Sequence, residues 1–273
     1  KKTGSCKNKQ NIVFAVLGKN DHDISPNEEQ EMRVYVGFDD TDVAGADRGT
    51  GKFARWFAAK IPAGVRLYGV VRQQLPVLEG IPYTSHNSSA CVVLDNVEPS
   101  QVTEIVERGS EHIREHFIEG SDPGLCVVAM DGTKTDTLME FGRLASTRLV
   151  SQREALQAAD GFHLSGHGGT NDGIIGAIAG VGLTLSGWCG RFIEYGKLRD
   201  FGTTVTVAEL EAEGMHVLSI DRNALATGKN DLVDTQGWLR PRLWASRPVV
   251  PVESCGHGQW RAVGGKGKQA HGG

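Results

Sequence analysis

One stretch near the N-terminal end combines a short strand pattern with a dense group of carboxylates. Apolar residues alternate from Val34 to Phe38, which predicts a strand with at least one buried face. Three carboxylates follow within four residues, at Asp39, Asp40 and Asp42. Because hard cations prefer oxygen ligands, a strand that ends in clustered carboxylates suits a magnesium site.

A glycine-bearing loop and a predicted helix come after these carboxylates. Thr50 lies between Gly49 and Gly51, and we expect it to cap a helix that carries Phe53, Trp56, Phe57 and Lys60. Such a helix start favours phosphate through its N–H groups and dipole. A solvated turn, in which Asp and Thr side chains satisfy the backbone, is the alternative. An ordinary P-loop is excluded, because Lys52 is followed by Phe53 instead of Ser or Thr.

Three motifs in this chain resemble one enzyme family. Gly37 to Asp42 reads Gly-Phe-Asp-Asp-Thr-Asp, which is similar to the opening motif of the archaeal tRNA-isoleucine agmatidine synthetases. Two later segments agree with that family, one from Ile81 to Ala90 and one from Gly173 to Ala179, and all three occur in the family's order. Members of the family use ATP to couple agmatine to a cytidine of the tRNA anticodon.

The resemblance implies a fold class and a division into domains. We expect an α/β (α+β) chain in which a kinase-like ATP-binding domain, residues 32–146, precedes a ferredoxin-like domain, residues 147–250. Residues 1–31 are expected to be an N-terminal extension and residues 251–273 a flexible basic tail. We expect neither the OB-fold nor the zinc ribbon with which the family binds tRNA, because 273 residues are too few for them. The five cysteines also include no C-x-x-C pair for a zinc ribbon.

The resemblance also implies ATP and magnesium as cofactors and assigns roles to residues. Asp39, Asp40 and Asp42 are expected to hold magnesium, and Thr50 lies near the family's phosphate-accepting threonine, which makes it a catalytic candidate together with Asp39 and Asp40. The expected nucleotide contacts are Thr41, Gly49, Gly51, Lys52 and Gly173, and the expected contacts to the second substrate are Tyr83, Asn87 and Asp172.

Several positions depart from the family pattern. Thr84, Ser85 and His86 replace its Lys-Thr-Arg, and Asp172 replaces an arginine, which reverses the charge in front of the helix predicted from Ile174. The glycine-dense loop before that helix is interpreted either as a phosphate cradle or as a site of close helix packing. Asp131 ends a second buried strand and is a further candidate for metal or hydroxyl contact, with a helix cap as the alternative.

These observations predict an ATP- and magnesium-dependent transferase or ligase-like enzyme that acts on a small amine or an RNA cytidine. A non-catalytic nucleotide-binding or partner-binding module is the alternative, and RNA binding through the basic C-terminal residues is a third hypothesis. The net charge of −4 gives no general attraction for nucleic acid, so we expect no DNA partner. The odd number of cysteines favours the cytoplasm, and the longest apolar run is too short for a membrane span.

Overall fold

The computed structural model describes residues 32–79, 81, 87–223 and 225–264. The predicted N-terminal extension therefore lies outside the described residues. The helices are α1 (Thr50–Phe57), α2 (Gln101–His116), α3 (Asp136–Ala145), α4 (Gln152–Ala158), α5 (Gly173–Leu185) and α6 (Val207–Ala212). The strands are β1 (Met32–Asp39), β2 (Arg66–Gln74), β3 (Ser88–Val97), β4 (Gly124–Ala129), β5 (His163–Gly166), β6 (Arg191–Glu194), β7 (Thr204–Thr206), β8 (His216–Ser219), β9 (Leu232–Asp234), β10 (Arg242–Trp244), β11 (Arg247–Gly256) and β12 (Gln259–Ala262).

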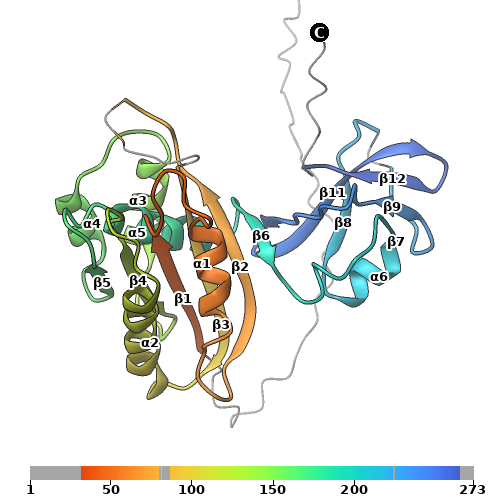
Figure 1. Cartoon of the computed structure of the whole chain (residues 1–273). Coiled ribbons are helices and arrows are strands. Elements are labelled where there is room, and N and C mark those ends of the chain that lie inside the picture. The colour runs from red at the N-terminus through yellow and green to blue at the C-terminus, as the bar shows by residue number, and fades with distance from the viewer. Residues whose placement is uncertain (1–31, 80, 82–86, 224, 265–273) are drawn as a thin grey trace, which may run out of the picture. The chain divides into compact units, whose positions relative to one another are not determined.

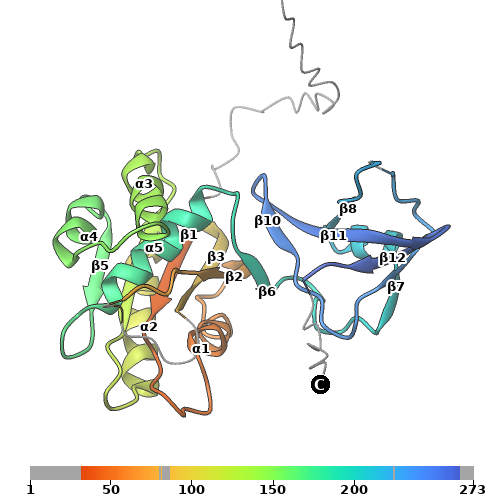
Figure 2. The same cartoon turned by 90° about the horizontal axis from the view of Figure 1, so that it is seen from above.

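The fold is a mixed α/β structure built on a large, mostly antiparallel sheet. The strands follow the order β5-β4-β1-β3-β2-β6-β10-β11-β12-β9-β7, and β8 pairs with β11. Helices α1 and α2 cover one face of the first strands, and α3, α4 and α5 cover the other (Figures 1 and 2). None of the helices in the described part of the chain is long and apolar enough to cross a membrane.

Strand β1 lies between β3 and β4 and divides its side chains between the two faces. Val34, Val36 and Phe38 belong to the apolar cluster that includes residues of α1 and α2. The alternate positions, Gly37 and Asp39, face α5 on the opposite side. The alternation predicted from the sequence is therefore present, and it directs the Asp39 carboxylate beneath α5.

Helix α5 packs unusually close to β1 because glycines replace side chains at the contact. A methyl group at Gly37 would lie 2.4 Å from the carbonyl oxygen of Ala177. A methyl group at Gly176 would lie 1.7 Å from Oδ2 of Asp39. The small residues of α5 therefore support the packing interpretation of the glycine-rich segment, and they also bring the start of the helix to the carboxylates.

This contact predicts a large effect of Gly37→Ala on stability. The new methyl group meets backbone rather than a flexible side chain, so the free energy of unfolding should fall by about 1–3 kcal/mol or more, as in an overpacked core. Thermal unfolding measures the change. Gly169→Ala is the matched control, because nothing lies within 4 Å of its Cβ position. An unchanged midpoint for Gly37→Ala would contradict the close packing of α5 on β1.

The C-terminal part of the chain corrects one boundary. Residues 251–256 and 259–262, predicted as part of a flexible basic tail, belong to β11 and β12. Val252 and Trp260 are buried there, and β12 pairs with both β11 and β9. The prediction of a flexible tail overlooked the buried apolar positions of these strands, among them Val252, Trp260 and Ala262.

Candidate functional site

The turn that follows β1 brings two neighbouring carboxylates to one side of the sheet. Asp39 is the last residue of the strand, and Asp40 has a φ of 49°, in the left-handed region. The carbonyl oxygen of Asp40 accepts a hydrogen bond from the backbone N–H of Asp122 at 3.2 Å, which fixes this turn against the start of β4. Without such a turn, consecutive strand residues would point to opposite faces.

These carboxylates line a cavity of about 450 Å³ at the N-terminal end of α5. The cavity gathers residues that are distant in the sequence, among them the predicted Asp42, Thr50, Asn87, Asp172 and Gly173. Its other polar lining residues include Asp122, Arg148 and Thr170, and its apolar lining consists of Leu75, Ile81, Ala145, Leu149, Val150 and Ile175. One pocket thus joins carboxylates, hydroxyls and an apolar wall.

The carboxylates of the cavity hold protons more tightly than exposed ones do. Burial, followed by the negative charges of Asp40 and Asp42, raises the pKa of Asp39 to about 8. Burial, followed by the charges of Asp122, Asp42 and Asp172, raises the pKa of Asp40 to about 6. Like charges held together in this way favour a proton or a cation between them.

Asp122 is the main site residue that the sequence analysis missed. Its two carboxylate oxygens accept hydrogen bonds from the backbone N–H groups of Asn171 and Asp172, both at 2.9 Å, and from the hydroxyl of Thr170. Asp122 therefore shapes the loop that leads into α5. In the sequence it stands directly before Pro123-Gly124, and no motif marks it as a site residue.

The position of Asp131 corrects a second expectation. Strands β1 and β4 are antiparallel, with Asp39 opposite Gly124, so the end of β1 lies beside the start of β4. Asp131 follows the other end of β4 and is exposed, and its Oδ1 accepts hydrogen bonds from the N–H and hydroxyl of Thr133. It therefore does not face Asp39, and it does not line the cavity.

Thr50 does not cap α1 through its side chain. The N-cap is Gly49, and Thr50 is the first residue of the helix. Its buried hydroxyl accepts a hydrogen bond from Thr41 Oγ1 at 3.2 Å and donates to Asp42 Oδ1 at 3.4 Å. Thr41 and Thr50 are therefore linked to the carboxylate group. Gly49 lies beside Asp42, since a Cβ atom added to Gly49 would be about 4 Å from the Asp42 carboxylate oxygens.

The remaining predicted residues occupy different places. Gly51 and Lys52 line a separate pocket, and Lys52 Nζ lies 5.1 Å from the Trp56 ring centroid. Asn87 Nδ2 donates to the Pro76 carbonyl at 2.7 Å. Tyr83 lies outside the described residues.

The N-terminal end of α5 combines two of the predicted contacts. Asp172 Oδ1 accepts from Gln152 Nε2 at 2.6 Å, and no side chain caps the helix. Gly173, its first residue, is buried and lines the cavity. Backbone N–H groups and the helix dipole make such an end attractive to anions, although the Asp172 carboxylate weakens that attraction.

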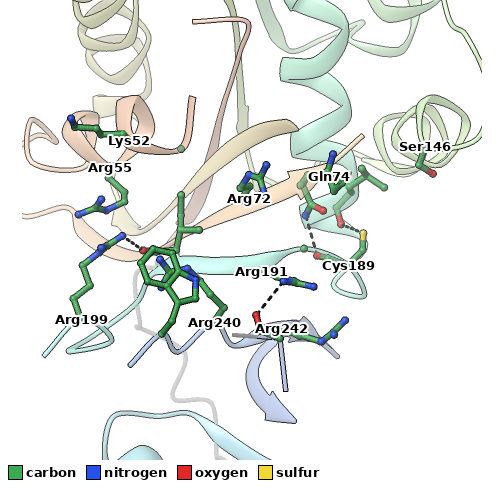
Figure 3. Close-up of a pocket in the computed structure, with 17 residues that line it drawn as sticks. Lys52, Arg55, Arg72, Gln74, Ser146, Cys189, Arg191, Arg199, Arg240 and Arg242 are labelled. Atoms are coloured by element: carbon green, nitrogen blue, oxygen red, sulfur yellow. Dashed lines mark hydrogen bonds between the residues drawn. The ribbon is translucent and has the colours of Figure 1, made fainter. Parts of the chain in front are cut away.

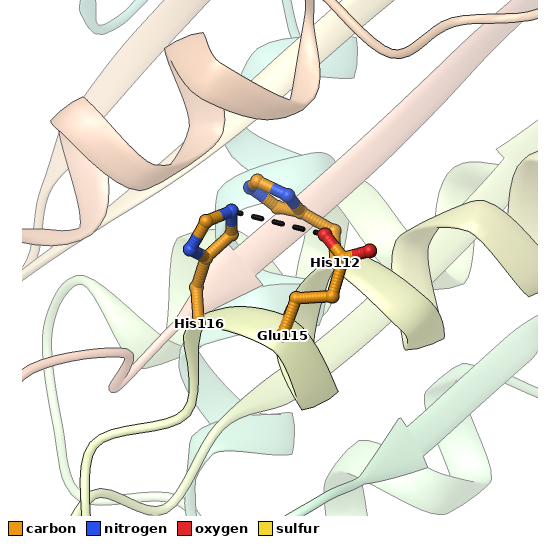
Figure 4. Close-up of side chains that lie close together, drawn as sticks. All are labelled: His112, Glu115 and His116. Carbon is orange, nitrogen blue, oxygen red and sulfur yellow. Dashed lines mark ion pairs between the residues drawn. The ribbon is translucent and has the colours of Figure 1, made fainter.

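A second group of potential metal ligands lies on α2. Ligand atoms of His112, Glu115 and His116 lie within 4.8 Å of one another (Figure 4). The cation of Lys60 is bonded to Glu115, and His112 Nε2 donates to the Phe53 carbonyl oxygen at 3.0 Å. Burial lowers the pKa of His112 to about 4. We assign this group to the packing of α2 against α1, because Lys60 already neutralises its carboxylate.

Comparison with known proteins gives partial structural similarity. No protein-family model matches the chain, and no curated protein matches it. A tRNA fluorescent labelling enzyme is similar at 27% identity and a TM-score of 0.46, over 55% of this chain and 36% of that one. TiaS, a tRNA agmatidine synthetase, is similar at 26% identity, with TM-scores of 0.45 without ligands and 0.47 in a complex with tRNA and ATP. The chain spans 35–36% of the length of these proteins.

Proposed function

We propose that this chain is an ATP- and magnesium-dependent transferase or ligase-like enzyme. The observation that carries the proposal is the convergence of Asp39, Asp40, Asp42 and Thr50 in one cavity at the N-terminal end of α5. The motif around these residues resembles the agmatidine synthetases, and we extend that resemblance to a kinase-like domain followed by a ferredoxin-like domain. A cytoplasmic location belongs to the same proposal.

The carboxylates of the cavity fit a divalent cation. Asp39, Asp40 and Asp42 offer several oxygen atoms, whereas the oxygens of Asp122 are already bonded to the loop before α5. Burial, and then the negative charges of neighbouring carboxylates, raises the pKa of both Asp39 and Asp40, so a cation among these oxygens would be favoured. A bound magnesium ion supplies that charge and neutralises nucleotide phosphates at the same place.

The rest of the cavity fits a nucleotide. Its apolar wall, which includes Leu75, Leu149 and Ile175, offers a surface for a base. The N-terminal end of α5 offers positive charge for phosphates, whereas the guanidinium of Arg148 is already paired with Glu154 at 2.8 Å. We therefore place the base against the apolar wall and the phosphates toward the carboxylates and Thr50.

Thr50 is positioned to react. Its hydroxyl oxygen would form a bond to the terminal phosphorus of ATP while the bond from that phosphorus to the ADP oxygen breaks. The hydroxyl proton would pass to Asp42, whose Oδ1 lies 3.4 Å away. A nitrogen or oxygen atom of the acceptor, a small amine or an RNA cytidine, would then form a bond to this phosphorus while the bond to the Thr50 oxygen breaks, and that oxygen would take back the proton from Asp42. Asn87 and Asp172 line the cavity in which the acceptor would bind.

ATP turnover by the purified protein tests this function. We expect magnesium-dependent release of ADP, and its stimulation by at least one member of a panel of amines or by RNA. A non-catalytic nucleotide-binding module is the second candidate, favoured by the carboxylate of Asp172 at a helix end where an arginine would attract phosphate. Tight magnesium-ATP binding without turnover would select the module.

Thr50→Ala should abolish turnover while the protein remains folded. The hydroxyl is the reacting group in the proposal, so we expect a loss of at least about 100-fold in the rate. The lost hydrogen bonds to Thr41 and Asp42 should reduce the free energy of unfolding by only about 1–3 kcal/mol. Steady-state turnover and thermal unfolding measure the two effects. Thr50→Ser keeps the hydroxyl and is the control, and full turnover by Thr50→Ala would remove Thr50 from the mechanism.

A further inference from the structure

A second pocket, of about 790 Å³, is lined by basic side chains that the proposed function does not use. Its arginines come from α1, β2, β6, β10 and the segments between them (Figure 3). They are Arg55, Arg72, Arg191, Arg199, Arg240 and Arg242, and Lys52 joins them. The lining contains no Asp or Glu in the described part of the chain. The pocket is therefore strongly positive although the chain as a whole carries a charge of −4.

Three of these arginines form a row across neighbouring strands. Arg72 of β2 is opposite Arg191 of β6, and Arg191 is opposite Arg242 of β10. Residues directly opposite in a sheet have Cβ atoms about 5 Å apart, and like charges in such pairs destabilise the sheet. A row of three guanidiniums is an arrangement that folding alone does not favour.

The row also lacks carboxylate partners. Glu194 pairs with Arg55 at 2.7 Å and with Arg199 at 3.0 Å. In the residues that the structure describes, no carboxylate forms an ion pair with Arg72, Arg191 or Arg242. Arg191 donates to the carbonyl oxygen of Gly264 at 3.3 Å, and Arg72 donates to the Ser88 hydroxyl at 3.1 Å.

The guanidiniums repel one another as well. Burial, and then the charge of Arg191, lowers the pKa of both Arg72 and Arg242. Burial, followed by the charges of Arg199 and Arg55, lowers the pKa of Arg240 to about 10. Burial and the neighbouring like charges both disfavour the charged form of these arginines, and an anion in the pocket would offset that cost.

An indole lies at the same pocket. Trp238 is partly exposed, and the guanidinium of Arg240 stacks on its ring at 3.7 Å from the centroid. Aromatic side chains beside arginines bind nucleobases by stacking, whereas guanidiniums bind phosphate oxygens in a bidentate manner. The lining thus offers surfaces for phosphates and for a planar ring.

The basic pocket adjoins the carboxylate cavity. Residues next to each other in the chain line the two on three separate elements: Thr50 and Gly51, Gln74 and Leu75, and Ala145 and Ser146. The two pockets are therefore lined by neighbouring residues of the same elements.

We infer that the basic pocket binds a ligand with several closely spaced phosphates beside a planar ring, which either a single-stranded nucleic acid or a free nucleotide can supply. The arginine row binds the phosphates, and Trp238 stacks on the ring. The inference stands independently of the proposed ATP chemistry, since it depends only on residues outside the carboxylate cavity. No magnesium is needed for binding, because the pocket itself supplies the positive charge.

Binding of three probes to the full chain without magnesium tests the inference. The probes are a 12-nucleotide single-stranded RNA, ATP and inorganic tripolyphosphate, and the variants are Arg191→Gln/Arg242→Gln and Trp238→Ala. For every probe that the wild type binds, we expect the affinity of the double arginine variant to be lower by at least about tenfold. The affinity of this variant should also depend less on salt concentration. Its thermal midpoint should stay the same or rise, because the row is self-repulsive, whereas removal of structural arginines would lower it.

The variants and probes separate the sources and the sites. Trp238→Ala should weaken the binding of RNA and ATP but leave the binding of tripolyphosphate unchanged. If the wild type binds RNA more tightly than ATP, the ligand is a single-stranded nucleic acid. Arg261→Gln, an exposed arginine on β12 outside the pocket, is the control and should bind as the wild type does. Asp40→Asn should keep magnesium-free binding even where magnesium-dependent ATP binding is lost. Wild-type protein that binds no probe, or a double variant with wild-type affinity, would overturn the inference.

Discussion

Magnesium and ATP together are expected to raise the thermal midpoint of the wild-type protein and to leave Asp39→Asn and Asp40→Asn almost unchanged. A ligand at 100 times its dissociation constant adds about 2.7 kcal/mol to the free energy of unfolding. Each variant removes one of the carboxylates that converge in the cavity. We expect both to lose most of that stabilisation, which corresponds to a loss of at least about 100-fold in affinity.

Without ligands, the same variants should be as stable as the wild type or more stable. Asp39 is half-buried beneath Gly176, and the charges of Asp40 and Asp42 add to the cost of its ionisation. An amide keeps the shape of the carboxyl group without the charge, and Asn accepts the left-handed conformation that residue 40 adopts. A residue that served only to form the turn would behave differently, because its replacement would lower stability and leave nucleotide binding intact.

Asp131→Asn is the matched control for this experiment. Asp131 also follows a strand end, but it is exposed, and its contacts are confined to Thr133. We expect normal magnesium-ATP stabilisation in this variant. If the wild type itself shows no magnesium-dependent stabilisation by ATP, the interpretation of the Asp39 to Asp42 segment as a nucleotide site is wrong.

The sequence predicted the parts of this site that depend on neighbours in the chain. The alternation in β1 is local, and so is the carboxylate cluster at its end, and the structure places both as expected. The glycines of α5 carried two open interpretations, and the packing of Gly37 and Gly176 supports the one based on close approach. The domain division and the roles of the site residues remain predictions.

The parts that the sequence analysis missed depend on strand order and direction. Asp131 was a plausible partner of Asp39 for a parallel pair of strands, but the antiparallel pairing of β1 with β4 brings Asp122 there instead. The row of Arg72, Arg191 and Arg242 joins three strands whose pairing no local pattern specifies. The pairing of strands that are distant in the sequence therefore determines both the position of Asp122 in the site and the position of the basic pocket.

The stability of the ligand-free protein should fall as pH rises through neutrality, and Asp39 should account for much of that fall. In the folded state the pKa of Asp39 is about 8 and that of Asp40 about 6, whereas an unfolded Asp titrates near 3.9. Between those limits the folded protein holds more protons than the unfolded chain. The stabilisation is therefore complete below about pH 4 and is lost as pH rises through the folded pKa values.

Each unit by which folding raises a pKa contributes at most about 1.4 kcal/mol to the free energy of unfolding. Solvent screening reduces the contribution of Asp40, which is half-buried. Buried His112, with a lowered pKa, acts in the opposite direction below about pH 6.5. The informative quantity is therefore the difference in unfolding free energy between wild type and Asp39→Asn, measured from pH 6.5 to 8.5. This difference cancels the histidine contribution.

We expect Asp39→Asn to gain stability relative to the wild type across this pH range. Magnesium with ATP should reverse the wild-type trend, because a cation competes with protons for the same oxygens and binds better as pH rises. Chemical denaturation at each pH, with and without magnesium-ATP, measures both effects. A difference between wild type and Asp39→Asn that does not change with pH would show that Asp39 is ionised throughout. In that case the self-repelling carboxylate group on which the cation site depends would not exist.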